Sequence, residues 1–401
     1  MNGPQNVRSN IAIALINASN ESYYSQLSLR GNSFSGEIVK PRVSFVIPCY
    51  KLAHLLPECV NSILSQTYGD FEVIIMDDCS PDRTPEVALS FHDPRVKHVR
   101  NEPNLGHLRN YNKGIELARG KYVWLISADD YLRRPYILDR YVQLMEKHPE
   151  VGYVFCPAMK VQDSQETDLV SWGFHGTQDT VFKDRDFLRK LLFGNCVVAP
   201  TGMVRKECYD KVSLFPLDMP NAGDWYLWCI FALHHDVAYL AEPMVNYRLH
   251  ESNMSVSLTK HDPVVIIADN IAVRWRIKEK AEEIGSDSIV SLCKDAIATY
   301  YANMVAAQMY ESPVFGLALE ECERSVPQYA RDENEAREMC ARVYTALGDQ
   351  CYLRRDFAQA RRYYGWVLQR EPWAVEPWAK YFLLHMGNVG VRVRNYASLC
   401  K

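Results

Sequence analysis

The chain has 401 residues, of which 48% are hydrophobic, so it is long enough for an enzymatic core and at least one further module. Its formal net charge of -4 gives no electrostatic reason to expect a nucleic-acid partner, since no basic stripe is present to neutralise a phosphate backbone. The twelve cysteines form no Cys-x-x-Cys pair, which argues against zinc or redox sites and predicts reduced, mostly buried thiols in an intracellular protein.

The first residues carry no pattern of membrane targeting. They lack a basic segment followed by a long apolar stretch, and the apolar run at 11–16 is shorter than the roughly 20 residues that a membrane span needs. We therefore expect a cytoplasmic protein, whose association with the inner face of a membrane would be peripheral. Residues 1–40 are rich in Asn and Ser with weak periodicity, and we expect them to form an N-terminal extension.

From Pro41 the chain alternates between short apolar runs and segments with helical periodicity. Strands are expected at 43–47, 71–76, 96–100 and 121–126, with helices between them. Gly120 is expected to stop the helix that precedes the last of these strands. Strands and helices that alternate at this spacing predict an α/β fold with a parallel, doubly wound sheet.

The strand at 121–126 runs into Ser127-Ala128-Asp129-Asp130, which sets two carboxylates at its carboxyl end, where an α/β sheet keeps its ligand site. Hard divalent cations such as Mg²⁺ or Mn²⁺ take oxygen ligands, and the substrate's phosphates usually complete the set. A nucleotide diphosphate is therefore the natural partner of this pair. Paired acids also form turns and helix N-caps, and for Asp129 and Asp130 alone this alternative stays open.

The turn after the first strand has the sequence Pro48-Cys49-Tyr50-Lys51. A dinucleotide-binding sheet needs glycines in this turn, because they let backbone amides approach a pyrophosphate. Without them, a metal has to neutralise the diphosphate, and Asp129 and Asp130 are the available ligands.

Over roughly Arg42 to Ser255 the chain resembles a family 2 glycosyltransferase of the GT-A fold. Five ordered segments carry the resemblance: 43–50, 73–84, Asn104-Leu105-Gly106 with Asn112 and Gly114, 127–130, and 223–228. Each segment alone is a weak motif, but all five in this order are specific. The resemblance implies a GT-A type, Rossmann-like and mostly parallel sheet flanked by helices over 41–256. It also implies transfer of a sugar from a nucleotide diphosphate donor, for which we expect UDP, to an acceptor hydroxyl.

The resemblance assigns the nucleoside site. Pro48 and Tyr50 match the segment that lines the nucleoside, and Asp78 matches the acid that accepts a hydrogen bond from the base, usually uracil. Such a carboxylate selects a ring that carries an N–H group. The alternative is that Asp77 and Asp78 cap the next helix.

The resemblance also assigns a metal site for Mn²⁺ or Mg²⁺. Asp130 matches the principal metal ligand, and Asp129 matches its partner, which contacts the sugar or ribose. His250 matches a segment that supplies a third metal ligand or closes over the diphosphate in some members, although a lone histidine is more often structural. Arg248 is a candidate diphosphate clamp, with an exposed arginine on a solvated face as the alternative.

Asp224 matches the catalytic base of inverting members. An acceptor hydroxyl is a poor nucleophile until its proton is taken, which a carboxylate can do. The alternative, compatible with the first, is that Asp224 is the N-cap of a helix.

Two positions depart from the family pattern. Members often carry Glu-Asp where this chain has Gly223-Asp224, and Arg-Asn where it has Tyr111-Asn112. Arg109, on the same helix as Tyr111, could compensate for the missing arginine only if the backbone were shifted.

The segment from 257 to 401 is predicted to be helical. Positions typical of one tetratricopeptide repeat fall at about 341–374, and they are Tyr344, Leu347, Gly348, Ala360, Tyr364 and Pro372. One repeat is too few for a free-standing solenoid, so the segment should pack against earlier helices or a partner, as a surface for oligomerisation or docking. An ordinary helical hairpin is the alternative, and Trp366, Trp373 and Trp378 are expected to fill its core rather than stack on carbohydrate.

These observations predict a metal-dependent, inverting glycosyltransferase with a glycan or lipid-linked acceptor, acting in surface polysaccharide or glycan synthesis. A sugar-nucleotide nucleotidyltransferase is one alternative, but it would need a Gly-rich loop with Lys or Arg after the first strand. A catalytically inactive helical-repeat adaptor is another, and the presence of Asp130 and Asp224 argues against it. The acceptor pocket is expected in the loops at 157–180 and 194–222, whose composition names neither the sugar nor the acceptor.

Overall fold

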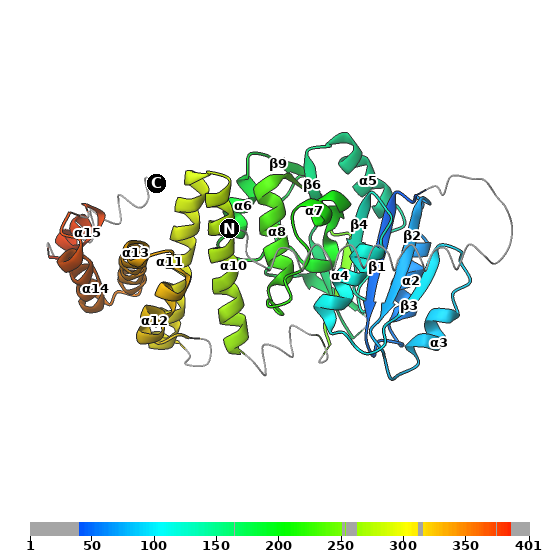
Figure 1. The fold of residues 1–401 in the computed structure, drawn as a ribbon, viewed down its shortest axis with the longest axis horizontal. Coiled ribbons are helices and arrows are strands. Elements are labelled where there is room, and N and C mark those ends of the chain that lie inside the picture. The colour runs from blue at the N-terminus through cyan, green and yellow to red at the C-terminus, as the bar shows by residue number, and fades with distance from the viewer. Residues whose placement is uncertain are drawn as a thin grey trace, which may run out of the picture. The chain divides into compact units, whose positions relative to one another are not determined.

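The computed structural model describes residues 40–163, 165–250, 253, 263–311, 316–373 and 375–385. The residues from Pro41 onward form one compact unit, in which an α/β part is followed by helices (Figure 1). Except for Lys40, the predicted N-terminal extension lies outside the described residues. The boundary predicted near residue 256 also falls outside them, and the domain limits stay a prediction.

The larger sheet has eight strands, in the order β3-β2-β1-β4-β10-β6-β11-β9. Their bounds are β1 Val43–Cys49, β2 Phe71–Asp77, β3 Val96–Arg100, β4 Tyr122–Leu125, β6 Val151–Phe155, β9 Thr180–Phe182, β10 Met203–Arg205 and β11 Asp236–Tyr239. Strands β1 to β4 pair in parallel, whereas β10 runs antiparallel to both β4 and β6. The predicted α/β class and the four predicted strands are confirmed.

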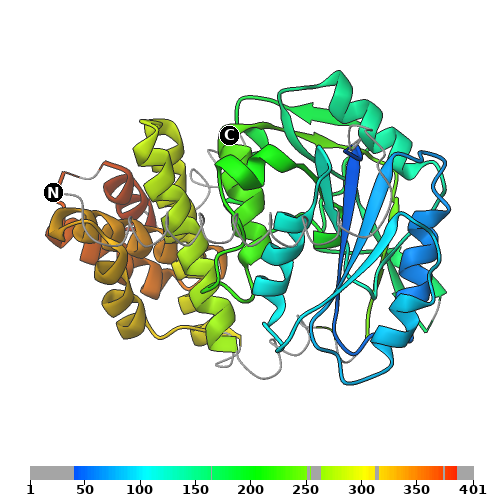
Figure 2. The same cartoon turned by 45° about the vertical axis from the view of Figure 1, so that its right-hand side comes forward.

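Helices cover both faces of the β1–β4 region (Figure 2). Their bounds are α2 Leu56–Leu64, α3 Thr84–Leu89 and α4 His107–Leu117. Side chains alternate along a strand, so Phe45 packs in one cluster with α2 and α3, and Val46 packs in another with α4. Burial on both faces explains why β1 and β2 are mostly apolar, with the buried polar residues Ser44, Glu72 and Asp77 as exceptions.

Gly120 does not end helix α4, contrary to the sequence expectation. The helix stops at Leu117, and Ala118 is already extended. The backbone N–H of Gly120 donates to the Ser44 hydroxyl at 2.8 Å, and a Cβ at position 120 would lie 2.6 Å from the Ser44 nitrogen. Glycine is needed here because the turn closely approaches β1.

A second sheet of four strands has the order β5-β12-β7-β8. Its strands are β5 Tyr131–Leu132, β7 Ala158–Gln162, β8 Gln165–Leu169 and β12 Val245–Arg248. Strand β12 pairs antiparallel with β5, directly after the Asp129-Asp130 segment, and parallel with β7. This pairing brings the end of β12, with Arg248 and His250, to the two aspartates.

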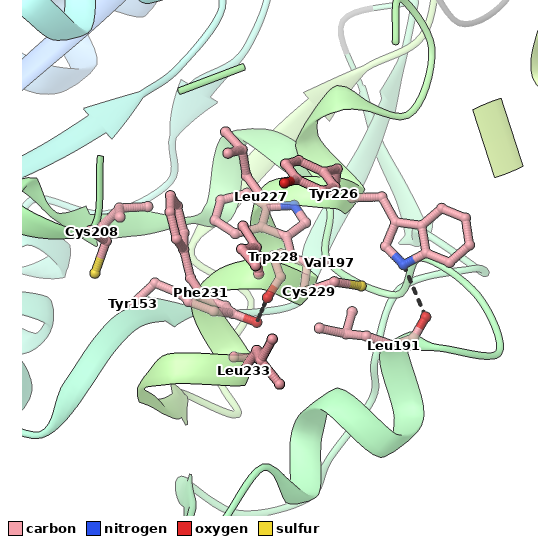
Figure 3. Close-up of a cluster of buried hydrophobic side chains, with 14 of the residues drawn as sticks. Tyr153, Leu191, Val197, Cys208, Tyr226, Leu227, Trp228, Cys229, Phe231 and Leu233 are labelled. Carbon is pink, nitrogen blue, oxygen red and sulfur yellow. Dashed lines mark hydrogen bonds between the residues drawn. The ribbon is translucent and has the colours of Figure 1, made fainter. Parts of the chain in front are cut away.

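Helix α8, Gly223–His234, is apolar on nearly all sides, and only Asp224 and His234 are not buried. Figure 3 shows the cluster that surrounds it. The Trp225 indole donates to the Leu191 carbonyl at 2.9 Å, and the Tyr153 hydroxyl donates to the Trp228 carbonyl at 3.3 Å. A helix enclosed in this way has little freedom to shift, so the position of its first turn is fixed.

Other helices complete the α/β part and form the C-terminal region. In the α/β part they are α5 Ile137–Lys147, α6 Asp186–Leu191, the 3-10 helix η1 Ala199–Thr201 and α7 Lys206–Lys211. In the C-terminal region they are α10 Pro263–Glu283, α11 Asp287–Tyr310, α12 Leu319–Tyr329, α13 Glu333–Leu353, α14 Phe357–Arg370 and α15 Val375–His385. Val273, Ile277 and Ala281 of α10 belong to the same apolar cluster as α8. The predicted helical C-terminal region is confirmed, and it packs against an earlier helix.

The α13–α14 hairpin carries the residues of the predicted repeat. Tyr344, Leu347, Ala360 and Tyr364 share one buried cluster, and a Cβ at Gly348 would lie 2.5 Å from the Tyr364 ring. These contacts suit either a tetratricopeptide-like repeat or an ordinary hairpin, and the repeat stays a prediction.

Only one of the three tryptophans expected in the tail core behaves as expected. Trp366 stacks on Tyr344, with ring centroids 3.7 Å apart. The expectation is wrong for Trp373 and Trp378, which are 91% and 48% exposed. Trp373 lies in the turn before α15 and Trp378 on that helix, and both line an open apolar pocket instead of the core.

A buried ion pair joins α10 to α13. The Lys278 ammonium lies 2.7 Å from a Glu335 carboxylate oxygen, and their side chains are 0% and 2% exposed. Lys278 also pairs with Glu282, and Glu335 also pairs with Arg331.

Two further expectations concern the cysteines and membrane-spanning helices. In the part of the chain that the structure describes, the cysteines are free and most are buried. None of the described helices combines the length and apolar character that crossing a membrane requires.

Candidate active site

A cavity of about 630 Å³ lies at the carboxyl ends of β1 and β4. Its described lining comes from these strands, α4, the first turn of α8, α10 and the loops between them. The lining residues are Pro48, His107, Leu108, Tyr111, Leu125, Ser127, Asp129, Asp130, Trp172, Asn195, Ala199, Pro200, Phe215, Pro220, Asn221, Gly223, Asp224, Tyr247, Asn253, Ile266 and Asn270. The structure thus brings Pro48, Asp129, Asp130 and Asp224 together around one space.

Asp129 has one carboxylate oxygen engaged and one without a partner. Its Oδ2 lies 3.0 Å from His250 Nε2 and accepts a hydrogen bond of 3.3 Å from the Asn253 amide. Its Oδ1 is buried and has no hydrogen-bond partner among the described residues. A buried carboxylate oxygen left in this state is unfavourable, and a bound cation or ligand donor would relieve it.

Asp130 is 4% exposed, and its Oδ1 accepts a hydrogen bond of 3.0 Å from the Arg248 backbone N–H. Burial, and then the charge of Asp129, raises the pKa of the Asp130 carboxyl well above its ordinary value. Two crowded carboxylates with one orphan oxygen fit a hard divalent cation whose other ligands are phosphate oxygens and water. Within the described ranges, no group of three or more His, Cys, Asp or Glu side chains is arranged to hold a metal. The two carboxylates would therefore be a partial ligand set.

The two residues expected beside the metal have protein partners. His250 Nε2 contacts Asp129, as described above. The Arg248 guanidinium donates to the Asp129 carbonyl at 3.0 Å and pairs with Glu58 of α2. The roles of His250 as a metal ligand and of Arg248 as a diphosphate clamp stay predictions.

Asp77 and Asp78 do not cap the following helix, so this alternative is wrong. The N-cap residue of α3 is Arg83, whose side chain makes no capping hydrogen bond. Asp77 is fully buried and pairs with Arg100 at 2.6 Å. The Asp82 carboxylate accepts instead from the Thr84 backbone N–H, at 3.1 Å.

The Asp78 carboxylate holds the turn before α4. It accepts hydrogen bonds from the Asn101 amide at 2.9 Å and from the backbone N–H groups of Leu105 and Gly106 at 2.8 and 2.9 Å. Tyr50, at the end of β1, is 44% exposed. The base-reading role of Asp78 and the nucleoside-lining role of Tyr50 stay predictions.

Asp224 lies in the first turn of α8 and is partly buried. Ala222 is the N-cap residue, so Asp224 is not, but its Oδ1 accepts from the Trp225 backbone N–H at 2.7 Å. Its Oδ2 accepts from the Asn195 amide at 3.3 Å. Burial raises the pKa of Asp224 to about 6, although the hydrogen bonds from Trp225 and Asn195 oppose the rise. A carboxylate with this pKa is ionised at neutral pH and can take a proton.

Sequence reasoning missed two polar residues that support Asp224. Asn195 fixes one of its oxygens, and Asp269 of α10 accepts from the backbone N–H groups of Asn221 and Ala222, at 2.7 and 3.1 Å. No local motif marks either residue, because each acts on a segment far away in the sequence.

Tyr111 stands at a position where the family pattern has arginine, and its ring lines the cavity between His107 and Phe215. Burial, then the charges of Asp129 and Asp224, raise the pKa of Tyr111. The departure from the motif was the signal that could have drawn attention to it. Arg109 is exposed and is not among the residues that line the cavity, so it gives no compensation.

Comparison with known proteins agrees with this geometry. Residues 44–212 match the model of glycosyl transferase family 2. A Haemophilus influenzae protein named "Uncharacterized glycosyltransferase" is 28% identical over 229 residues, which are 55% of this chain and 69% of that protein. The Streptococcus pneumoniae protein "Glycosyltransferase GlyG" is 36% identical over 111 residues, 27% of this chain and 37% of that protein.

Solved structures show the same fold. A crystal structure of S. aureus TarS 1-349 in complex with UDP has a TM-score of 0.54 and 16% sequence identity, and the match covers 82% of this chain and 92% of that one. The complex of the same protein with UDP-GlcNAc gives a TM-score of 0.51. The sheet order and these comparisons agree: residues 44–212 match the model of glycosyl transferase family 2, and the fold is that of the TarS structures, of the GT-A type.

Proposed function

We propose that the protein is a metal-dependent, inverting glycosyltransferase that moves a sugar from a UDP-linked donor to an acceptor hydroxyl. The observation that carries this proposal is that Asp129, Asp130 and Asp224 line one cavity at the carboxyl edge of the sheet. This edge is where α/β sheets bind their ligands.

The donor end of the cavity is formed by Asp129 and Asp130. These two residues would hold Mg²⁺ or Mn²⁺, with His250 as a further candidate ligand, and the bound ion would offset the charge that develops on the leaving diphosphate. Pro48, Tyr50 and Asp78 would bind the nucleoside. UDP is proposed because crystal structures of S. aureus TarS contain UDP and UDP-GlcNAc.

The chemical role of the chain's own residues centres on Asp224. Its carboxylate would take the proton of the acceptor hydroxyl while that oxygen attacks the anomeric carbon from the side opposite the diphosphate, which inverts the configuration. Asn195 and the Trp225 backbone N–H hold the two carboxylate oxygens at fixed positions, so the base is oriented before the acceptor arrives. The product would belong to surface polysaccharide or another glycan, built on a glycan or lipid-linked acceptor.

The first test is binding. Thermal unfolding is measured with UDP, GDP, CDP and TDP, each with Mn²⁺ and with a chelator. A ligand present at a concentration of about 100 times its Kd adds about 2.7 kcal/mol to the free energy of unfolding, which is readily measured as a higher melting temperature. The expected result is that UDP with Mn²⁺ stabilises the protein and the other nucleotides do so less. Equal stabilisation in the chelator would contradict metal dependence, and no response to any nucleotide diphosphate would contradict the donor class.

The second test is turnover. The expected result is metal-dependent release of UDP from UDP-sugars, slow in the presence of water alone and faster with an acceptor. Formation of a sugar nucleotide from a nucleoside triphosphate and a sugar phosphate would instead identify a nucleotidyltransferase. A correctly folded protein that does neither would be the inactive adaptor.

A further inference from the structure

An exposed indole lies in the cavity wall. Trp172, in the turn after β8, is 47% exposed and lines the cavity. Its turn is fixed, because the Gly173 backbone N–H donates to the Val170 carbonyl at 3.0 Å and Phe174 packs against Tyr239 with ring centroids 4.9 Å apart. A large aromatic surface that is held in place but left uncovered offers a platform for a ligand.

The indole belongs to the same wall as the candidate base. The Phe174 backbone N–H donates to the Cys196 carbonyl at 2.8 Å. Asn195, the residue before Cys196, donates from its side-chain amide to the Asp224 carboxylate at 3.3 Å. Trp172 and Asp224 are thus connected through two adjacent backbone segments, and both line the cavity. A molecule bound on the indole would therefore share the cavity with Asp224.

Helix α10 completes this wall. Ile266 and Asn270 line the cavity, and Asp269 between them holds the backbone of Asn221 and Ala222. Arg274, one turn further along, donates to the Leu192 carbonyl at 2.9 Å. Helix α10 is thus hydrogen-bonded both to the segment that leads into α8 and to the loop after α6, which fixes the backbone that carries Ile266 and Asn270.

The charges in the cavity are all of one sign. Asp129, Asp130 and Asp224 are acidic, and no Lys or Arg occurs among the lining residues that the structure describes. Burial lowers the pKa of His107, whose Nε2 lies 3.0 Å from the Pro220 carbonyl oxygen. The other polar lining groups are amides and hydroxyls, which suit the hydroxyl groups of an uncharged sugar, whereas a carboxylate or phosphate near Asp224 would be repelled.

We propose that Trp172 and Asn270 form the acceptor subsite, and that it binds an uncharged sugar ring stacked on the Trp172 indole with its hydroxyl groups toward Asn270 and Asp224. This proposal rests on the proposed function and narrows it, because it names the acceptor class as a neutral glycan. The apolar face of a pyranose matches an indole, and the ring hydroxyls match the amide and carboxylate groups around it.

The experiment compares transfer to a panel of neutral para-nitrophenyl glycosides with transfer to the matching hexuronides. Glucoside and glucuronide differ only at C6, where a hydroxymethyl group is replaced by a carboxylate, so they isolate charge. The variants are Trp172→Ala, Trp172→Phe and Asn270→Ala. Trp373→Ala is the matched control, because Trp373 is 91% exposed on another element and does not line the cavity.

The expected result is transfer to a neutral glycoside with a KM that rises by roughly tenfold or more in Trp172→Ala and by less in Trp172→Phe. The Kd for UDP should stay near wild type in all variants, and Trp373→Ala should behave as wild type in transfer as well. Preference for the hexuronide, an unchanged KM in Trp172→Ala, or donor hydrolysis without transfer to any neutral glycoside would each overturn the subsite. Failure of wild type to bind or hydrolyse any UDP-sugar would instead overturn the proposed function.

Discussion

The carboxylate of Asp269 accepts a hydrogen bond of 3.1 Å from the backbone N–H of Ala222, the N-cap residue of helix α8, two positions before Asp224. Asp269 lies on α10, which follows the family-matched residues 44–212. A helix of the C-terminal region therefore fixes the backbone that carries the candidate base, and the tail contributes directly to the site.

Replacing Asp269 with alanine should lower turnover without weakening the donor site. The Asn221 and Ala222 N–H groups would lose their acceptor, and a small displacement of a catalytic group can cost about 10²-fold in rate. We expect kcat to fall and Kd for UDP with Mn²⁺ to stay unchanged, as measured by kinetics and titration calorimetry. Glu279→Ala, an exposed acid on the same helix, is the control. Equal loss of donor binding would indicate general unfolding instead.

Removal of the tail after Ser255 should make the protein aggregate or change its oligomeric state. Val273, Ile277 and Ala281 are fully buried in one cluster with α8, and truncation would expose the apolar surface they cover. Gel filtration with light scattering is the measurement. A monomeric and active fragment 41–255 would show that the tail is dispensable.

Asp224→Asn should separate catalysis from folding. An amide oxygen can still accept from the Trp225 N–H, but it cannot take a proton, so transfer should fall by roughly 10²–10⁴-fold. UDP binding should survive. The decisive comparison pairs melting temperature with sugar transfer, and a variant that melts normally and transfers at the wild-type rate would exclude Asp224 as the base.

The pH dependence of transfer should follow Asp224. Because burial raises its pKa to about 6, kcat/KM should rise through that pH and level off above it, and the residual activity of Asp224→Asn should lack this limb. The pKa of Asp130 is also raised, so its ionisation should affect metal-dependent UDP binding. Measuring the Kd for UDP over the same pH range separates this effect from the effect of Asp224 on transfer.

The contribution of Asp224 to the free energy of unfolding should fall as the pH rises, whereas kcat/KM should increase. A raised carboxyl pKa means that the native state resists ionisation, so the stabilisation is present below the ordinary pKa of 3.8 and is lost as the pH rises through about 6. Asp224→Asn should therefore melt no lower than wild type at pH 8, and any advantage should vanish in acid. A variant that melts lower at pH 8 would contradict this account.

Asp130→Ala should abolish metal-dependent UDP binding, because it removes one of the two carboxylates. Asp130→Asn is the more informative partner variant, since its oxygen can still accept from the Arg248 N–H and keep β12 in place. Titration calorimetry should find no binding in either, with circular dichroism unchanged for the Asn variant. Wild-type affinity in both would remove the metal from this site.

Strands β1, β2 and β4 were predictable because they are mostly apolar runs, and the helices between them have a clear period, whereas β6, β9, β10 and β11 of the same sheet were not predicted. The sequence also predicted that Asp129, Asp130 and Asp224 lie close together, because the segments 127–130 and 223–228 match motifs that form one site in the family they resemble. Other features depend on partners that the sequence does not reveal. Asp78 has the expected motif position, but its hydrogen bonds to Leu105 and Gly106 follow from how the turn folds back.

Long-range polar contacts were equally invisible. Asp269 and Ala222 are 47 positions apart, and neither lies in a motif, so no local pattern could pair them. Trp373 illustrates the converse, because a tryptophan beside an apolar helical segment is normally expected inside, and only the structure shows that this one, in the turn before α15, is 91% exposed.

The buried Lys278–Glu335 pair constrains how this chain can evolve. Loss of Glu335 would leave the fully buried Lys278 ammonium with Glu282 as its remaining partner, and loss of Lys278 would leave the buried Glu335 carboxylate to Arg331 and Lys294. Either single loss would therefore weaken the contact between α10 and α13, because a buried charge is stable only when it is well paired. A lineage that replaces one of the two residues would therefore pass through a less stable intermediate before the second is replaced. Among related chains in which α10 still packs against α13, we therefore expect that the residues at positions 278 and 335 are either both charged or both apolar.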